Sequence, residues 1–384
     1  MKKFVVVLFV ASFLFFYCSE KEISLQGTDF PLKNNQVRFE KKTLYAVEDT
    51  VIREEVKSGA GQVLFIGKYE NFEAEILLKF EELPDTSTVN SAVLILNKKG
   101  LIGKGSPFKC SVYEITSDWQ EDMNSFIENG AEFPVSYNRK EVGSFFSSNE
   151  STLDSVTIES ELVNKWINSF EDNKGILISF SNSEFIKGYF SNETSKPPTI
   201  KINYIKDNRD TVEFYSATKG LFLIKGEVPG NNGFGIVNTA TGGRVGLKFD
   251  LKDIPDYVTI LRAKLKLDIL SEKSLFSDFS IDSLKTVLFD TSWSVVPRSY
   301  YTTVTRENAI EDNKFETDIT AFVQLWVSGG KDNYGLAVQS FKEGEDISYF
   351  AIALANEGNG YKPRLEIEYA VPPTKFLKRN ENQP

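Results

Sequence analysis

The chain has 384 residues and a formal net charge of −10, with 44 Lys and Arg side chains against 54 Asp and Glu side chains. It contains no histidine, which excludes histidine general bases, Ser-His-Asp triads and ordinary histidine-bearing zinc sites. The acidic balance argues against nucleic acid and anionic lipid surfaces as partners.

Residues 1–18 are predicted to form a lipoprotein signal peptide. Lys2 and Lys3 precede an apolar run from Phe4 to Tyr17, which has the length of a signal-peptide core and is short for a membrane span. Cys18 follows and is the predicted lipidation site. The bulky Tyr17 departs from the small residue usual before such a cysteine, so ordinary cleavage and an uncleaved anchor remain alternatives. We expect a protein held to the membrane by its N-terminal lipid, at the outer membrane or the cell surface.

The next segment, residues 19–44, is polar and lacks periodicity, which predicts a tether. A first domain is predicted over 45–206, with Asp49 to Arg53 as its opening strand. A second is predicted over 208–370, opened in the same way by Asp210 to Phe214. Residues 371–384 contain Pro372 and Pro373 near their start and are predicted to form a disordered tail.

A repeated stretch marks both domains, because residues 161–178 align with residues 321–338 without a gap. Each copy has apolar residues at the spacing of a short amphipathic helix, centred on Trp166 or Trp326. An Asp-Asn-x-Gly sequence then predicts the helix end and a turn, and an apolar run predicts a buried strand. We interpret both tryptophans as core residues; an exposed sugar-stacking role is the alternative.

Two long segments, 120–152 and 294–314, have little periodicity and are predicted to be loops that carry the variable function. They hold three tyrosines that could stack on a sugar ring if they are exposed, namely Tyr137, Tyr300 and Tyr301. Packing of these rings within the loops is the alternative interpretation.

Acidic residues in the first of these regions form the candidate metal site. Asp118, Glu121 and Asp122 lie close in sequence and could hold calcium through carboxylate oxygens. A solvated acidic turn is the alternative. Cys110 has no disulfide partner once Cys18 carries a lipid, and its alternating surroundings predict a small buried side chain.

The fold class follows from many short alternating segments, closely spaced turns and one short helix per copy. Residues 262–269 show the strict alternation of a half-buried antiparallel strand, and helical crossovers between strands are missing. We therefore predict an all-β protein with two tandem antiparallel β-sandwich domains, jelly-roll-like, each with one short helix.

In their order and spacing, these motifs resemble the DNRLRE domain, which is related to family 96 carbohydrate-binding modules and the disaggregatase-related repeat. The first copy carries Asp49-Thr-Val-Ile-Arg, Val112-Tyr-Glu-Ile-Thr-Ser-Asp-Trp119, Val163-Asn-Lys-Trp166, Asn173-Lys-Gly175 and Pro198-Thr-Ile-Lys-Ile-Asn-Tyr204. The second keeps Trp293, Trp326 and Asn333-Tyr-Gly335 but departs at Glu213-Phe214. The resemblance implies a non-catalytic module of exported proteins, some of whose relatives bind polysaccharide.

Two functional hypotheses follow. The first is a non-catalytic surface lipoprotein whose tandem modules bind polysaccharide; the second is a structural or adhesive surface protein that binds a protein partner. No cofactor is expected beyond the calcium considered above. An exposed tyrosine-lined groove would favour the first hypothesis, and an apolar patch or open sheet edge would favour the second.

Overall fold

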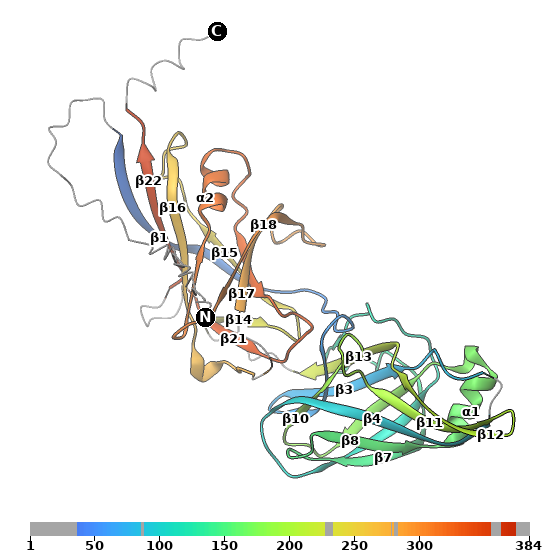
Figure 1. Ribbon diagram of the computed structural model, residues 1–384. Helices are drawn as coiled ribbons and strands as arrows, with labels where there is room; N and C mark the ends of the chain where they lie inside the picture. The colour runs from blue at the N-terminus through green and yellow to red at the C-terminus, as the bar shows by residue number, and fades with distance from the viewer. Residues whose placement is uncertain are drawn as a thin grey trace, which may run out of the picture. The chain divides into compact units, whose positions relative to one another are not determined.

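The computed structural model of the protein describes residues 37–85, 88–226, 233–277, 279, 283–354 and 362–373, without the side chains of residues 302–307. The predicted signal peptide, Cys18 and most of the predicted tail lie outside these residues. Residues 38–372 form one compact unit. It is built almost wholly of β-strands in two curled sheets, which confirms the predicted all-β class with two β-sandwiches (Figure 1).

Sandwich 1 is formed by the twelve strands β2 to β13, whose pairs are antiparallel except for β6 with β13. Its strands are β2 (Val63–Tyr69), β3 (Phe72–Lys79), β4 (Thr88–Ile102), β5 (Phe108–Ile115), β6 (Phe126–Ile127), β7 (Tyr137–Ser147), β8 (Leu153–Ile158), β9 (Ile176–Ser181), β10 (Ile186–Phe190), β11 (Thr199–Lys206), β12 (Arg209–Ser216) and β13 (Lys219–Gly226). The main path through the sheet runs β12-β11-β4-β10-β2-β3-β9-β5-β7.

Sandwich 2 is formed by ten strands, of which the first comes from the beginning of the described chain. They are β1 (Arg38–Arg53), β14 (Phe234–Asn238), β15 (Gly243–Phe249), β16 (Thr259–Asp268), β17 (Ser283–Phe289), β18 (Tyr300–Ala309), β19 (Lys314–Asp318), β20 (Leu336–Ser340), β21 (Tyr349–Ala353) and β22 (Arg364–Val371). The main path runs β18-β17-β20-β15-β1-β22-β16-β19.

The two predicted helices are present as α1 (Ser160–Asn168) and α2 (Thr320–Val327). Trp166 and Trp326 are both buried in the cores of their sandwiches, which confirms their interpretation as core residues. Short 3-10 turns add η1 (Phe170–Asp172) and η2 (Ser271–Lys273). Neither described helix has the length and apolarity needed to cross a membrane.

The turn after the helix is the same in both sandwiches, including one side-chain hydrogen bond of its asparagine. The Asn173 side-chain amide donates to the carbonyl of Phe80 at 2.6 Å, and Asn333 donates to the carbonyl of Phe249 at 2.8 Å. The glycine two residues later has φ +90° in both copies. A Cβ on Gly175 would lie 2.2 Å from the carbonyl oxygen of Leu78, so glycine is required by both conformation and space.

Each sandwich has its own apolar core between its layers. The core of sandwich 1 includes Cys110, which is fully buried as predicted. A further apolar cluster draws residues from both sandwiches, among them Phe72 and Phe222 from sandwich 1 and Phe234 and Tyr349 from sandwich 2. The two sandwiches of the compact unit therefore share an apolar cluster in addition to their separate cores.

Strand pairing departs from the sequence prediction in one systematic way. The segment Asp49 to Arg53, predicted to open the first domain, lies in β1, which pairs with β15 and β22 of sandwich 2. The segment Asp210 to Phe214, predicted to open the second domain, lies in β12, which pairs with β11 of sandwich 1. In Figure 1 the blue β1 accordingly lies beside the red β22. Alternation along a strand shows which face is buried but not which strand lies alongside it.

Three predicted irregular regions are also partly ordered into strands. β1 begins at Arg38, so residues 38–44 of the predicted tether belong to a strand. The predicted loop 120–152 contains β6 and β7, and the predicted loop 294–314 contains β18 and the start of β19. Tyr137, Tyr300 and Tyr301 therefore stand at the first residues of strands and not in free loops. Edge strands rich in polar residues lack the clean alternation on which the prediction relied.

Candidate functional site

The candidate site lies on the face of sandwich 1 that points away from its core. Apolar residues of β3, β5, β9 and β13 form a second small cluster on this face, covered by the segment between β5 and β7. Trp119, Ile127 and Val135 are the buried residues that the covering segment contributes to this cluster. The cover reaches only part of the sheet, and polar side chains occupy the face beside it.

A hollow of about 110 Å³ opens beside the covering segment, and we call it the sheet-face pocket. Its lining residues come from β3, β6, β9 and β13, and they are Glu73, Glu75, Ile127, Phe180, Leu223 and Lys225. Regular alternation puts Glu73 and Glu75 on one face of β3, while Ala74 and Ile76 point to the other. The pocket thus combines an apolar floor with carboxylate and ammonium groups.

Three aromatic rings run along the sheet from the edge of this pocket, and we call them the aromatic wall. The Lys225 ammonium lies 5.3 Å from the ring centre of Phe133. Phe133 and Tyr137 are 5.9 Å apart between ring centres, and Tyr137 and Tyr113 are 5.4 Å apart. Tyr137 is 37% exposed, so the predicted candidate offers part of its ring to solvent.

The charges in the pocket are held by protein partners. Ser179 donates a hydrogen bond to Glu75, and Lys68 pairs with Glu73 at 2.7 Å. Burial raises the pKa of Glu75, and the Ser179 hydrogen bond and the positive charge of Lys225 offset this only in part. Glu75 is therefore a carboxyl whose charged form is disfavoured by its surroundings.

The equivalent place in sandwich 2 is closed by an internal network. Tyr137 pairs with Ile115, and Tyr300 pairs with Phe289 in the corresponding position. The Tyr300 hydroxyl donates to Glu54 at 2.8 Å, and Arg298 donates to the same carboxylate at 3.3 Å. Arg244 lies 5.1 Å from the centre of the Tyr300 ring. Burial and the Glu54 hydrogen bond raise the pKa of Tyr300 to about 12.

The other predicted tyrosine of sandwich 2 is a packing residue. Tyr301 is half-buried against the sandwich 2 core, and the ammonium of Lys331 lies 4.5 Å from its ring centre. Tyr300 contacts Glu54 and Arg244 in the same way, so protein groups already contact both Tyr300 and Tyr301 where a sugar would have to stack. Of the three predicted tyrosines, the structure leaves Tyr137 as the candidate for stacking on a sugar.

The predicted calcium ligands are not brought together. Asp118 pairs with Lys174 at 2.7 Å, and this hydrogen bond lowers the pKa of the Asp118 carboxyl. Glu121 accepts hydrogen bonds from the backbone of Gly220 and from Asn192. Within the described ranges no group of three or more Asp, Glu or Cys side chains could hold a metal ion. The three carboxylates have separate partners, with Asp122 4.0 Å from the ammonium of Lys57.

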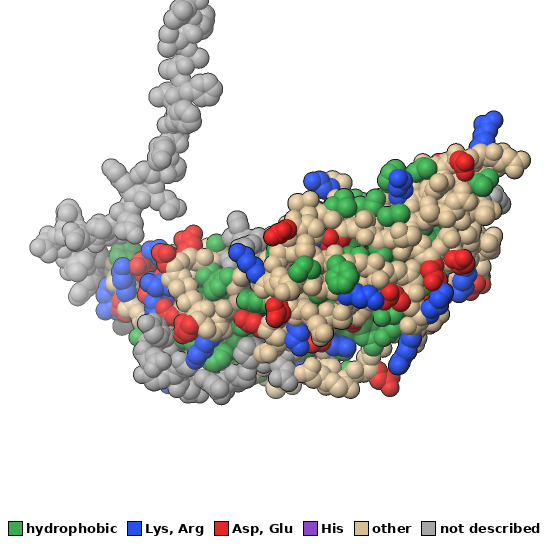
Figure 2. Space-filling model, turned by 90° about the horizontal axis from the view of Figure 1, so that it is seen from below, with side chains coloured by type: hydrophobic (Ala, Val, Ile, Leu, Met, Phe, Trp, Pro, Cys, Tyr) green, Lys and Arg blue, Asp and Glu red, His purple; other side chains and the backbone are tan. Residues whose placement is uncertain are grey.

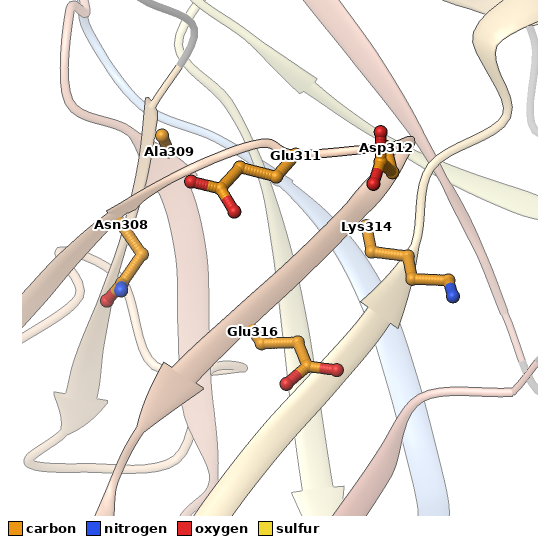
Figure 3. A pocket seen from close by; sticks show the side chains of 6 residues that line it. All are labelled: Asn308, Ala309, Glu311, Asp312, Lys314 and Glu316. Atoms are coloured by element: carbon orange, nitrogen blue, oxygen red, sulfur yellow. The ribbon is translucent and has the colours of Figure 1, made fainter. Parts of the chain in front are cut away.

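A larger hollow of about 280 Å³ lies at the turn between β18 and β19 in sandwich 2. Its lining residues are Asn308, Ala309, Glu311, Asp312, Lys314 and Glu316. In Figure 3 their side chains extend in different directions along the hairpin. This hollow lacks aromatic residues and convergent polar groups, so we do not assign it a site.

The face of the molecule drawn in Figure 2 carries both signs of charge. In Figure 2, Lys and Arg side chains are interspersed with Asp and Glu side chains, with hydrophobic side chains between them. The site residues missed by the sequence analysis are Glu73, Glu75, Tyr113, Phe133, Ser179 and Lys225. Alternation along β3 already placed Glu73 and Glu75 on its polar face, but the neighbouring strands are fixed only by tertiary structure.

Comparison with known proteins identifies no family. No family model matches the chain, and no curated protein matches it. Among solved structures, it is similar to the N-terminal CBM22-1–CBM22-2 tandem domain of Xyn10C from Paenibacillus barcinonensis. The identity is 8%, the TM-score is 0.15, and the match covers 87% of this chain and 91% of that one. At that TM-score the similarity carries no argument.

Proposed function

We propose that the protein is a non-catalytic binding protein whose sandwich 1 takes a glycan at the sheet-face pocket. The observation that supports this most directly is the aromatic wall of Tyr113, Phe133 and Tyr137 beside Glu73, Glu75 and Lys225. The apolar faces of aromatic rings suit the C–H faces of a sugar. Carboxylate and ammonium groups beside them suit its hydroxyls.

Binding is favoured over hydrolysis because both carboxylates already have protein partners. A glycosidase requires one carboxyl as general acid and another as base or nucleophile, both facing the glycosidic bond. Glu75 accepts from Ser179, and Glu73 pairs with Lys68. The DNRLRE-like motifs support the same conclusion, because that resemblance implies a non-catalytic module. Attachment to the cell envelope through Cys18 is part of the proposal and rests on the sequence alone.

The direct test measures binding of residues 19–384 to an array of neutral and acidic polysaccharides, with and without calcium. We expect saturable binding that falls strongly for Tyr137→Ala and Phe133→Ala. Tyr300→Ala is the matched control, because Tyr300 is the equivalent residue of sandwich 2 and is held by Glu54.

Four results would change the proposal. Equal loss for Tyr300→Ala and Tyr137→Ala would move the site away from the aromatic wall. Absence of binding to every glycan, with unchanged unfolding curves, would contradict glycan recognition for the sugars tested. Release of reducing ends from a bound polysaccharide would contradict the non-catalytic assignment. A calcium requirement would point to ligands other than the dispersed Asp118, Glu121 and Asp122.

A protein partner is the second candidate function, favoured by one open sheet edge. β12 is the terminal strand on its end of the sandwich 1 path, and its Phe214 and Val212 are 62% and 49% exposed. An exposed edge strand with apolar side chains can pair with a strand of another protein. Val212→Lys together with Phe214→Lys would abolish such binding and leave glycan binding unchanged.

A further inference from the structure

Sandwich 2 obtains one of its strands from the far end of the chain. β1 precedes every strand of sandwich 1 in the sequence, yet its two halves complete two ladders of sandwich 2. Arg38 to Tyr45 pair with β22, and Ala46 to Arg53 pair with β15. β1 therefore closes a groove between β15 and β22.

Sandwich 1 shows how the equivalent groove is closed locally. Its last strand, β11, turns through Asp207 and Asn208 directly into β12, and the chain continues into β13. Both turn residues have positive φ, 51° and 61°, as in the tight hairpin turns that match the twist of the strands. β12 pairs with β11 and β13 pairs with β3, so the two together occupy the place that β1 occupies in sandwich 2.

Sandwich 2 cannot use this solution. Its last strand, β22, ends at Val371 and is followed by Pro372 and Pro373. Proline has no backbone N–H and a fixed φ, so this pair cannot form the Asp207–Asn208 type of turn. The strand that fills the groove has to come from elsewhere.

The donated strand is held by two backbone ladders and by side-chain ion pairs such as Lys41 with Glu368 and Lys42 with Asp253. Of the β1 side chains, Ala46 and Ile52 are buried, whereas Phe39, Tyr45 and Val47 are between 54% and 64% exposed. Recognition by ladder hydrogen bonds, with a few side chains setting the register, is the chemistry of strand addition to a sheet.

The donor strand is fixed to sandwich 1 just beyond its end. The Ser58 hydroxyl donates to the carbonyl of Phe222 at 2.8 Å, and the Ser58 backbone N–H donates to the hydroxyl of Ser125 at 2.8 Å. In any copy, these hydrogen bonds hold Ser58 to sandwich 1, and β1 ends only a short way before Ser58 in the chain. Because the ladder partners of β1 are β15 and β22 of sandwich 2, the β1 strand of another copy would offer them the same backbone groups.

We propose that the β15–β22 groove of sandwich 2, which β1 of the same chain fills, is a strand-accepting site that also takes β1 of a second copy of this chain. Exchange between copies links the acceptor groove of one molecule to the sandwich 1 of the next. This contact is independent of glycan binding.

The test uses cysteine pairs in the chain from residue 19, where the remaining Cys110 is fully buried and does not compete. Thr43 and Glu366 are register partners between β1 and β22. One copy carries Thr43→Cys and a second, of different mass, carries Glu366→Cys. The two are unfolded in urea together, refolded at high concentration and oxidised. Lys42→Cys replaces Thr43→Cys in the control, because adjacent residues of a strand point to opposite faces.

We expect a disulfide-linked pair of the two copies, formed about tenfold more with Thr43→Cys than with Lys42→Cys. A synthetic peptide of residues 38–53 carrying Thr43→Cys should be captured in the same way when Glu366→Cys chains refold in its presence. The proposal is overturned if neither the copy nor the peptide is captured above the Lys42→Cys control. It is also overturned if a single chain with both cysteines forms no internal disulfide, because β1 would then not occupy the groove.

Discussion

The Glu75 carboxyl gives a pH-dependent prediction for the candidate site. Its pKa is raised in the folded state above the ordinary value of 4.5, chiefly by burial. The folded state therefore holds this proton more tightly than the unfolded state, and stability decreases as pH rises through 4.5 to the raised pKa. Glu75→Gln removes that decrease, because a carboxamide does not titrate in this pH range, while its oxygen can still accept the hydrogen bond from Ser179.

We expect the urea midpoint of Glu75→Gln to change less between pH 4 and pH 7 than that of the natural chain. Glu73→Gln is the control, since Glu73 lies on the same face of β3 and pairs with Lys68. Identical pH profiles for the natural chain and Glu75→Gln would show that the carboxyl is not perturbed by burial.

A second titratable group lies inside sandwich 1 and bears on its stability. The fully buried Lys187 ammonium donates to Asp154 at 2.7 Å, to Ser151 at 2.7 Å and to the carbonyl of Ser148 at 3.1 Å. Tyr189 also donates to Asp154. All three ammonium protons are used, so the pair is fully satisfied in the core.

Lys187→Met should reduce the free energy of unfolding by about 3–5 kcal/mol, because it leaves the Asp154 carboxylate buried without its counter-charge. Chemical denaturation of the variant measures the loss, with the exposed Lys104→Met as control. The double variant Lys187→Met with Asp154→Leu should recover part of it. A loss for Lys187→Met no larger than for the control would contradict this account.

At the scale of the element, the helix–turn–strand unit predicts how glycine substitutions will differ. Gly175 and Gly130 both have positive φ, but only Gly175 also lacks room for a Cβ, which would lie 2.2 Å from the Leu78 carbonyl oxygen. Gly130→Ala meets nothing within 4 Å. We expect Gly130→Ala to cost about 1 kcal/mol from backbone strain alone, and Gly175→Ala more than about 3 kcal/mol, because β3 must also move.

Urea unfolding of the two alanine variants separates the cost of backbone strain at positive φ from the cost of the steric clash with β3. Gly335→Ala, whose Cβ would lie 2.6 Å from the Leu247 carbonyl oxygen, should resemble Gly175→Ala. Equal costs for Gly130→Ala and Gly175→Ala would show that the close approach to β3 is relieved without loss.

The sequence was informative about this unit because its signals are local. The apolar spacing around Trp166 and Trp326 identifies a helix face, and Asn-x-Gly identifies the turn that ends it. The Asn173 hydrogen bond to Phe80 joins residues far apart in the chain, and no periodic pattern contains it. For the same reason, the sequence identified Tyr137 as a candidate but not its neighbours Phe133 and Lys225.

Strand order was the part of the fold that was hardest to predict from the sequence. Asp49-Thr-Val and Asp210-Thr-Val have the same letters and were given the same role, but β1 lies in sandwich 2 and β12 in sandwich 1. The two-residue turn at Asp207–Asn208 was the available signal, since it makes β12 continue the sheet of β11. The Pro372–Pro373 pair was the complementary signal at the end of sandwich 2.

At the scale of the whole molecule, the exchanged strands predict which fragments of the chain fold. Residues 54–226 contain every strand of sandwich 1, whereas residues 45–206 lack β12 and β13. β13 contributes four consecutive buried apolar side chains, from Leu221 to Ile224. We expect the 54–226 fragment to unfold cooperatively in urea, at a lower midpoint than in the full chain because Phe72 and Phe222 lose their sandwich 2 neighbours. Fragment 45–206 should lack a cooperative transition, and fragment 54–206 should fail in the same way, which assigns the defect to the missing β12 and β13 and not to the extra residues 45–53. Cooperative unfolding of 45–206 at the midpoint of 54–226 would show that sandwich 1 needs neither β12 nor β13.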